Sequence, residues 1–387
     1  NLGNILQILG KLKEAELSTR KAIHINPDFA EAYSNLGNIL RVLGKLKEAE
    51  LSTRKAIHIN PDFAEAYSNL GNILRVLGKL DDAINHYKKA IELNNKLSTA
   101  KSGLLEVKGL ICDWSDQETQ ALWLDTLGIE GSSVYPLDLF CLEDKPLKQL
   151  NIAKKLYKER YSKKSKPLAT FKNKKIHIGY FSADFRAHPM MFLMGSMFKL
   201  HDKSKFQIYL YSFVEHEDEY TRKARESGCI FRDIKELNDI EAVKLARSDH
   251  LDIAIDRMGY CMGNRMNIFS YRVAPIQIHY LAYPGTLGAN TIDYLIADKI
   301  IIPKGYEKYY NEKIIRMPSC YQCNDDKKEI CNEPISRKEF NLPEEGFVFT
   351  CFCANQKITP KEFDIWMRLL RKIQGSVLWL YQSNKYS

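Results

Sequence analysis

The stretch NLGNILRVLGKLKEAELSTRKAIHINPDFAEAYS, residues 35–68, is the second of two almost identical copies in this chain of 387 residues. Residues 1–34 form the first copy, which differs at two positions, one of them Gln7 where the second copy has Arg41. A third copy opens at Asn69 and diverges after twelve residues. Such self-similarity at a fixed period of 34 residues indicates a stacked repeat.

Each copy has the pattern of two helices. Apolar side chains recur at helical spacing over residues 30–43, and a second helix runs from Leu46 to Asn60-Pro61, where proline ends it. One such pair cannot bury its own apolar face, so the copies must stack on one another. The period is that of the tetratricopeptide repeat (TPR), and we predict an α-solenoid of these repeats over residues 1–107.

Asparagines recur along the first helix of the repeats, at Asn35, Asn38, Asn69 and Asn72. An amide side chain offers a donor and an acceptor together, so a row of them can hold a peptide backbone. Repeat arrays carry their function on one such face. The pattern therefore favours protein or peptide binding on the concave surface, or else simple solvation of an exposed face.

The composition, 45% hydrophobic and 27% charged with mean hydropathy −0.35, is typical of globular domains. No apolar run is long enough to span a membrane, and no signal peptide opens the chain, which reads as a fragment. Nine scattered cysteines predict reduced thiols in the cytoplasm. Cys320 and Cys323 have the spacing of half a zinc site, but no second pair completes it, so no metal site is predicted.

The net charge of +9 invites a hypothesis of nucleic-acid binding. Residues 151–175, however, hold ten Lys and Arg against one acid, and this segment alone accounts for the whole excess. It lies in a helical linker predicted over 108–173, with amphipathic helices at 116–127 and 146–161. A charge run of this kind is usually a solvated face. The sequence therefore gives no support for a nucleic-acid partner.

From residue 174 the pattern changes to alternating strands and helices, which predicts a parallel sheet covered by helices over 174–335. Ligands of such sheets bind beyond the carboxyl ends of the strands. The strands are expected at 176–181, 206–213, 229–233, 251–255 and 276–281, with helices at 190–200, 219–227, 239–248 and 264–272 between them.

Polar residues fall at that carboxyl edge, namely His188, Asp256 and the turn Tyr283-Pro284-Gly285-Thr286. His188 is the candidate general base, because imidazole titrates near neutral pH and can accept a hydroxyl proton. The alternative is a histidine that caps a helix or lies on the surface.

A second sheet is predicted over 336–387, with strands at 347–352 and 377–381. Between them, Thr359 and Glu362 have the spacing of a capping box at a helix start. Lys357 just upstream makes a diphosphate site plausible there. The alternative is simple capping beside an exposed lysine.

Together these motifs resemble the O-linked N-acetylglucosamine transferase family, in particular its bacterial-type members. The resemblance spans nearly the whole chain. Its most specific parts are Gly179-Tyr180-Phe181-Ser182-Ala183-Asp184-Phe185 with His188-Pro189, the block from Gly259 to Pro303, Tyr321-Gln322 with Asn324-Asp325, and Lys357-Ile358-Thr359-Pro360.

The resemblance implies a GT-B architecture, in which two Rossmann-like lobes hold a nucleotide sugar between them; the second lobe is expected to be incomplete here. It implies transfer of N-acetylglucosamine from UDP-N-acetylglucosamine to Ser or Thr hydroxyls, with inversion and without a metal or other cofactor. His188 matches the family's proposed base and Lys357 the lysine that neutralises the leaving diphosphate. Donor contacts are implied for Tyr283, Pro284, Thr286 and Gln356, and peptide contacts for the four asparagines.

The chain departs from the family pattern at several places. Phe192 stands where animal members have a second histidine, Cys261 where the family has threonine, and Val273 where it has proline. The family's His-Thr-Thr loop lies beyond the strand at 377–381, so we expect this chain not to turn over donor alone. Two alternatives stay open: a GDP-fucose-dependent O-fucosyltransferase of the plant Spindly type, and a non-catalytic TPR adaptor.

Overall fold

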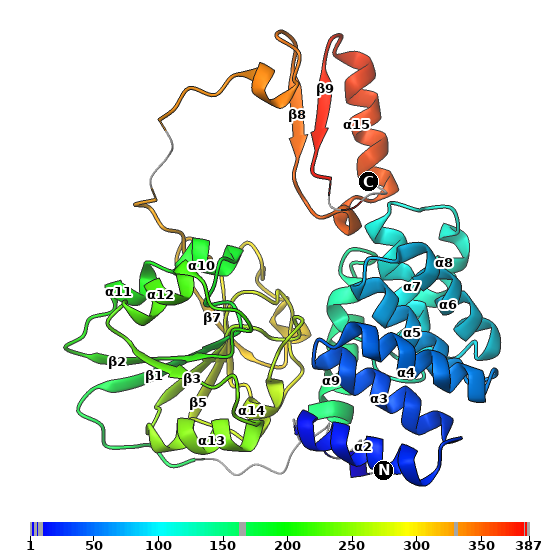
Figure 1. Ribbon diagram of the computed structural model, residues 1–387. Helices are drawn as coiled ribbons and strands as arrows, with labels where there is room; N and C mark the ends of the chain where they lie inside the picture. The colour runs from blue at the N-terminus through cyan, green and yellow to red at the C-terminus, as the bar shows by residue number, and fades with distance from the viewer. Residues whose placement is uncertain are drawn as a thin grey trace.

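The computed structural model has three parts: helical repeats, an α/β lobe beside them, and a smaller α/β unit over the end of the repeats (Figure 1). Residues 162–167 of the predicted basic segment, and Cys331, lie outside the described residues. The described residues are 2–3, 6, 11–161, 168–328, 332–382 and 384.

The repeats form antiparallel helix pairs, as predicted. Helix α3 contacts α5, and α5 contacts α7, so these three helices form one layer. The pairs pack closely because the first helix of each carries a glycine: a Cβ atom at Gly37 would collide with the Thr53 hydroxyl, and one at Gly71 would lie 2.6 Å from the Tyr87 ring. The helices are α2 Leu12–Ile25, α3 Ala30–Val42, α4 Leu46–Ile59, α5 Ala64–Val76, α6 Leu80–Leu93 and α7 Ser98–Leu110.

The connecting segment is packed into the molecule. Its last helix turns Ala153, Leu156 and Tyr157 into the core of the α/β lobe, while Lys154 and Lys158 stay exposed. Residues 154–160 of the basic run thus lie on a helical segment between the repeats and the lobe in Figure 1, whereas residues 168–175 of the run are not helical. The segment comprises α8 Gln117–Leu124, η1 Pro136–Leu139, α9 Pro146–Leu156 and the π-helix η2 Tyr157–Tyr161.

The lobe contains the predicted parallel sheet, with strand order β3-β2-β1-β4-β5-β6-β7. The order reverses between β1 and β4, which is where such sheets bind ligands. Two strands, β6 and β7, were not predicted; Lys313 and Arg316 close the ends of β7, so its apolar run is only two residues long. The strands are β1 Ile176–Ser182, β2 Phe206–Ser212, β3 Ile230–Asp233, β4 Ile253–Asp256, β5 Ile276–His279, β6 Tyr294–Ala297 and β7 Lys313–Arg316.

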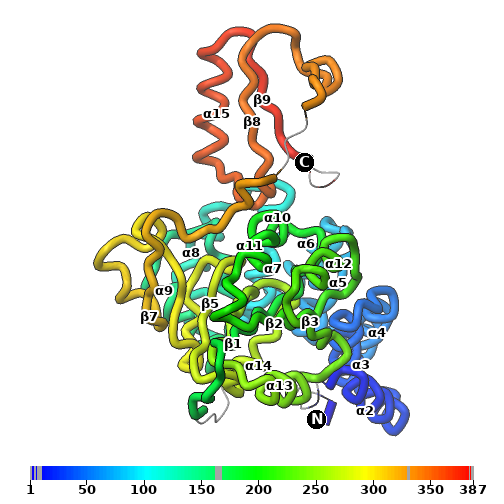
Figure 2. Tube along the Cα trace, turned by 90° about the vertical axis from the view of Figure 1, so that its left-hand side faces the viewer, coloured from blue at the N-terminus to red at the C-terminus, as the bar shows by residue number. Residues whose placement is uncertain are grey.

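Helices cover both faces of the sheet, and Figure 2 shows α10, α11 and α12 on one side with α13 and α14 on the other. The strands alternate accordingly: Tyr180 and Leu210 pack under α10, whereas Phe181 and Tyr211 stack on each other, 4.2 Å between ring centroids, on the side of α13. The helices are α10 Pro189–Met194, α11 Met197–Leu200, α12 Glu219–Arg225, α13 Asp239–Ser248, α14 Met266–Ser270 and η3 Glu307–Tyr309.

The second unit has one parallel strand pair, β8 with β9, joined through α15. It rests on the repeats: the Asn355 amide donates to the Leu110 carbonyl at 3.2 Å, and the rings of Trp114 and Phe363 lie 5.5 Å apart. The elements are η4 Arg337–Phe340, β8 Val348–Cys351, η5 Asn355–Lys357, α15 Pro360–Lys372 and β9 Val377–Leu380.

The capping box predicted at the start of α15 is not formed. The Thr359 hydroxyl makes no capping hydrogen bond to the helix backbone and instead binds the Glu362 carboxylate. A hydroxyl that donates to the neighbouring acid satisfies both side chains locally, which leaves the first backbone N–H groups of α15 without this cap.

Candidate functional site

The candidate base His188 lies where the chain leaves β1 and enters α10. Its Nδ1 atom is 3.3 Å from the backbone N–H of Met190 and 3.5 Å from the Asp184 carboxylate. The imidazole is one-third exposed, while Asp184 is buried. Burial, together with the charges of Arg186 and Arg257, lowers the pKa of His188 in spite of Asp184. The histidine is therefore neutral at pH 7 and able to accept a proton.

The two contacts of Nδ1 require different tautomers. When Nδ1 accepts from Met190, Nε2 carries the proton and cannot act as a base. When Nδ1–H points to Asp184, the Nε2 lone pair is free for a substrate proton. Asp184 thus favours the tautomer that can act as a base, whereas the capping contact favours the inactive one. The capping contact predicted as the alternative is present, and Nε2 remains available for the predicted role of a base.

Arg257 lies at the same edge, directly after β4, and is fully buried. None of its three guanidinium nitrogens has a hydrogen-bond partner among the described residues. Its guanidinium lies over the rings of Phe185 and Phe198, at 5.4 and 5.6 Å from their centroids. Burial lowers the pKa of Arg257 to about 10, and the nearby charge of Asp184 opposes that shift. A positive charge therefore stands behind the Asp184–His188 pair.

A second aspartate–histidine pair joins the ends of β4 and β5. The Asp256 carboxylate lies 3.0 Å from His279 Nδ1 and accepts the backbone N–H groups of Met258 and Gly259. His279 Nε2 lies 2.8 Å from the Tyr283 carbonyl, which can only accept, so Nε2 carries a proton. Burial alone would lower the pKa of His279, but the hydrogen bond and charge of Asp256 outweigh it and raise that pKa.

The turn after β5 is strained. Leu281 and Ala282 both have φ of 61°, in the left-handed region that residues with a Cβ atom rarely adopt. The Tyr283 N–H donates to the Leu281 carbonyl at 2.8 Å, and His279 holds the Tyr283 carbonyl. The buried pair therefore fixes a strained backbone at the carboxyl edge of the sheet, a position typical of functional sites.

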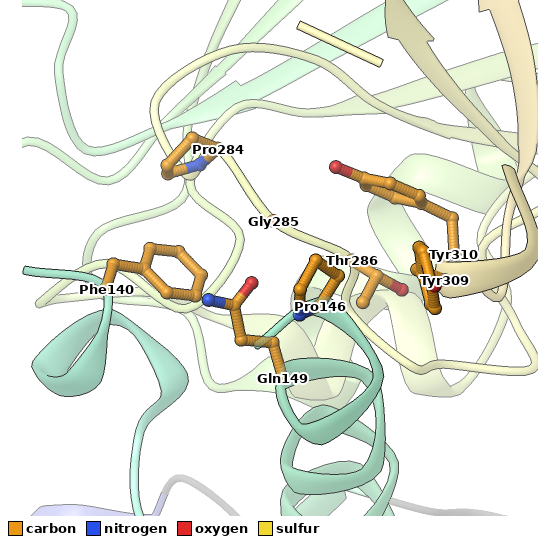
Figure 3. Close-up of a pocket in the computed structure, with 8 residues that line it drawn as sticks. All are labelled: Phe140, Pro146, Gln149, Pro284, Gly285, Thr286, Tyr309 and Tyr310. Atoms are coloured by element: carbon orange, nitrogen blue, oxygen red, sulfur yellow. The ribbon is translucent and has the colours of Figure 1, made fainter. Parts of the chain in front are cut away.

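The following residues line a pocket of about 110 Å³ between the lobe and the connecting segment (Figure 3). Of the predicted donor contacts, Pro284 and Thr286 face this pocket, but the Thr286 hydroxyl donates to Glu312 at 2.6 Å. Tyr283 is buried, with its hydroxyl turned to the Thr286 carbonyl. The pocket is lined by Phe140, Pro146, Gln149, Pro284, Gly285, Thr286, Tyr309 and Tyr310.

The other two predicted donor contacts, Gln356 and Lys357, lie on η5 in the second unit. Lys357 is exposed. Its charge acts on the half-buried Cys141 thiol, whose pKa is raised by burial and partly lowered by Lys357. The Gln356 amide oxygen is buried without a hydrogen-bond partner among the described residues, beside Gly109 of α7. The structure thus places these two residues against the end of the repeats.

The asparagines of the repeats lie on the contacting helices α3 and α5, and we call Asn35, Asn38, Asn69 and Asn72 the asparagine ladder. Asn38 donates to Asn69 at 3.3 Å, and Asn72 accepts the Tyr87 hydroxyl at 2.9 Å. All four side chains are half-buried, so the row is partly accessible.

Sequence reasoning found His188 but not the groups around it. Asp184 stands four residues before His188, a spacing that could have marked the pair. Arg257 could have been found as a lone cation at the end of an apolar strand. No local pattern marks Leu281 and Ala282, because only the folded backbone shows their left-handed conformation.

Two kinds of feature are absent from the described part of the chain, a group of metal ligands and a membrane-spanning helix. No three His, Cys, Asp or Glu side chains there are grouped closely enough to hold a metal ion. No helix there has the length and apolar character needed to cross a bilayer. The eight cysteines among these residues are free thiols.

The sequence model of glycosyl transferase family 41 matches residues 144–333 and 327–385, more than half of the chain. Tetratricopeptide repeat models match residues 1–29, 30–63 and 64–97. The family match includes both aspartate–histidine pairs and Lys357.

Curated relatives include the probable UDP-N-acetylglucosamine–peptide N-acetylglucosaminyltransferase SEC of Arabidopsis thaliana, 34% identical over 54% of this chain and 22% of the relative. The Caenorhabditis elegans UDP-N-acetylglucosamine–peptide N-acetylglucosaminyltransferase is 32% identical over 56% of this chain and 20% of its own length. A solved mutant O-GlcNAc transferase of Thermobaculum terrenum superposes with TM-score 0.63 and 25% identity, covering 98% of this chain and 66% of that one. The chain thus spans about a fifth of the length of these curated relatives.

Proposed function

Because this chain belongs to glycosyl transferase family 41, we propose that it is part of an enzyme that transfers N-acetylglucosamine from UDP-N-acetylglucosamine to Ser or Thr hydroxyls of proteins. The observation that carries the proposal is the Asp184–His188 pair at the carboxyl edge of the sheet. It puts a neutral imidazole beside the point where the strand order reverses, and ligands bind there in sheets of this kind.

In the proposed reaction, the acceptor hydroxyl oxygen attacks the anomeric carbon of the sugar from the side opposite the nucleotide. The bond from that carbon to the diphosphate oxygen breaks, so configuration is inverted and UDP leaves. The hydroxyl proton would pass to Nε2 of His188, in the tautomer whose Nδ1–H points to the Asp184 carboxylate 3.5 Å away. Lys357 would balance the negative charge that grows on the leaving diphosphate, in place of a metal ion.

The acceptor is proposed to lie along the asparagine ladder on the concave face of the repeats. The half-buried amides of Asn35, Asn38, Asn69 and Asn72 would bind its backbone. Because backbone recognition ignores side chains, this arrangement suits many acceptor sequences. The free thiols support a reducing, cytoplasmic setting for the reaction.

We expect a complete donor site to need further residues than those of this chain. Tyr283 and Thr286 are turned into the lobe, and Gln356 and Lys357 lie on another unit, so few exposed groups remain for uridine. We therefore expect the 387-residue chain alone to transfer sugar at most slowly.

The experiment compares His188→Ala with His216→Ala, an exposed histidine of the same lobe, in the protein extended through the rest of its reading frame. Transfer of labelled N-acetylglucosamine to a Ser/Thr peptide should fall by about 10²–10⁴-fold for His188→Ala and stay unchanged for His216→Ala. Both variants should still be stabilised by UDP in thermal unfolding.

Other outcomes would overturn parts of this proposal. Retained transfer by His188→Ala would refute its role as the base. Stabilisation by GDP in preference to UDP would favour the fucosyltransferase alternative. Stabilisation by neither nucleotide, without transfer, would favour a non-catalytic adaptor.

A further inference from the structure

Three arginines from separate elements gather on the side of the repeats that faces the connecting segment. We call Arg41 of α3, Arg75 of α5 and Arg160 of η2 the arginine cluster. Arg41 and Arg75 occupy equivalent positions on α3 and α5, two helices in contact. Burial lowers the pKa of Arg41, and the charges of Arg75 and Arg160 lower it further. Like charges repel at this range, and their gathering calls for an explanation.

Only one of the three has a carboxylate partner in the described parts of the chain. Arg75 forms an ion pair with Glu106 at 2.5 Å. Arg41 reaches the Asn38 side-chain oxygen at 3.4 Å, and Arg160 reaches the Ser133 carbonyl at 3.4 Å. These are long contacts to neutral groups. Arg160 is exposed and lies over the Tyr135 ring at 5.0 Å, so Arg41 is the half-buried guanidinium left without a counter-charge among the described residues.

The acids that face the cluster do not neutralise it. Burial raises the pKa of Glu106 to about 7, so this carboxyl is partly protonated at neutral pH. Burial also raises the pKa of Asp138, whose carboxylate accepts the Ser102 hydroxyl at 2.9 Å. The cluster therefore carries net positive charge at pH 7 and gains more as the pH falls.

The cluster continues the asparagine ladder. Arg41 follows Asn38 by three residues and contacts its side chain, and Arg75 follows Asn72 by the same spacing on the next repeat. Residues three apart share one face of a helix. A peptide held by the ladder would therefore pass directly beside the guanidinium groups.

We propose that the arginine cluster selects acceptor polypeptides that carry Asp or Glu beside the ladder, with Arg41 pairing with that carboxylate. This proposal rests on the peptide binding proposed above. The planar guanidinium fork of arginine matches a carboxylate better than lysine does. A carboxylate here would supply the counter-charge that Arg41 lacks among the described residues.

The sequence itself offers a substitute for arginine at this position. The first repeat is almost identical to the second but has Gln7 where the second has Arg41. Arg41→Gln therefore reproduces a residue that the repeat already carries. Arg54→Gln is the matched control, because Arg54 belongs to the same repeat but lies on α4, where it pairs with Glu50.

The test measures binding of two labelled twelve-residue peptides to the full chain by fluorescence anisotropy, without donor. One peptide carries four Glu around a central Thr-Ser, and the other carries Gln at those positions. We expect the Glu peptide to bind about tenfold more tightly, by the usual strength of a charge-assisted pair. Arg41→Gln should remove this preference, and Arg54→Gln should keep it.

The preference should also grow between pH 8 and pH 6, because Glu106 becomes protonated and releases Arg75. Equal affinities for the two peptides, or a preference that survives Arg41→Gln, would overturn the proposal. So would competition by a single-stranded oligonucleotide as effective as the Glu peptide, since that would indicate general binding of polyanions. Because no donor is present, these results are independent of whether sugar transfer occurs.

Discussion

Two histidines stand beside aspartates at the same edge of the sheet, and their surroundings are opposite. His279 is buried, and both its nitrogens are engaged, by Asp256 and by the Tyr283 carbonyl. His188 is one-third exposed, and its Nε2 has no hydrogen-bond partner in the described residues. The two pKa values shift in opposite directions because of these surroundings. The hydrogen bond and charge of Asp256 raise the pKa of His279, whereas burial and nearby cations lower the pKa of His188. A histidine with both nitrogens bonded holds structure, whereas one with a free nitrogen can do chemistry.

The largest effect expected from this comparison concerns Asp184. Asp184→Asn should reduce sugar transfer by about 10²–10⁴-fold, because an amide that donates to Nδ1 leaves the proton on Nε2, where it blocks base catalysis. Steady-state kinetics of the extended protein measure this effect, and a thermal midpoint within a few degrees of wild type excludes misfolding. Wild-type activity in Asp184→Asn would show that Asp184 does not set the tautomer.

A change in the Asp256–His279 pair should alter the stability of the fold rather than the rate of transfer. Asp256→Asn should cost about 3–5 kcal/mol in the free energy of unfolding, because it leaves a buried imidazole without its counter-charge. Urea unfolding measures this loss. A cost below 1 kcal/mol, comparable with that of Asp184→Asn, would erase the distinction between the two pairs.

The Asp256–His279 pair should also make the stability of the fold depend on pH. The folded pKa of His279 is raised, so its contribution to stability is complete below the unfolded value of about 6.5 and is lost as pH rises through the folded pKa. Wild type should therefore lose stability over that window, and Asp256→Asn should lose less.

Arg257 provides a further test of the comparison, because its charge lowers the pKa of His188. Arg257→Met should lower the free energy of unfolding by less than Asp256→Asn does, because the buried guanidinium makes no hydrogen bond that the change would break. It should also move the acidic limb of the pH–rate profile to higher pH, since removing the cation raises the pKa of His188. The exposed Arg186→Met is the control for stability and should stay within about 0.5 kcal/mol of wild type. A large loss of stability in Arg257→Met would mean that the cation is needed to compensate Asp184.

The smallest effect concerns the strained turn that His279 supports. Ala282→Gly should stabilise the protein by about 1 kcal/mol, because glycine adopts φ of 61° without steric cost. Ala254→Gly in β4 should instead destabilise it by about 0.5–1 kcal/mol, since that alanine is in a regular strand. If both changes destabilise equally in urea unfolding, the turn stores no strain.

Local patterns in the sequence determined much of the architecture. The 34-residue period predicted the helix pairs to within one or two residues at the bounds of α3 and α4, because their apolar spacing and the Asn60-Pro61 stop act over short range. Alternation predicted the parallel sheet and the place of His188 after β1. The strands β6 and β7 were missed, although β3, β4 and β5 of the same four-residue length were predicted.

Only the tertiary structure determines which charged side chains lie close to one another. Residues 184 and 257, or 256 and 279, are brought together only when β1, β4 and β5 align their carboxyl ends. The arginine cluster likewise joins helices 34 residues apart with a π-helix more than 80 residues further on. The sequence determined these residues and their local elements, but pairing energies depend on distance and burial, and both arise only when separate elements pack.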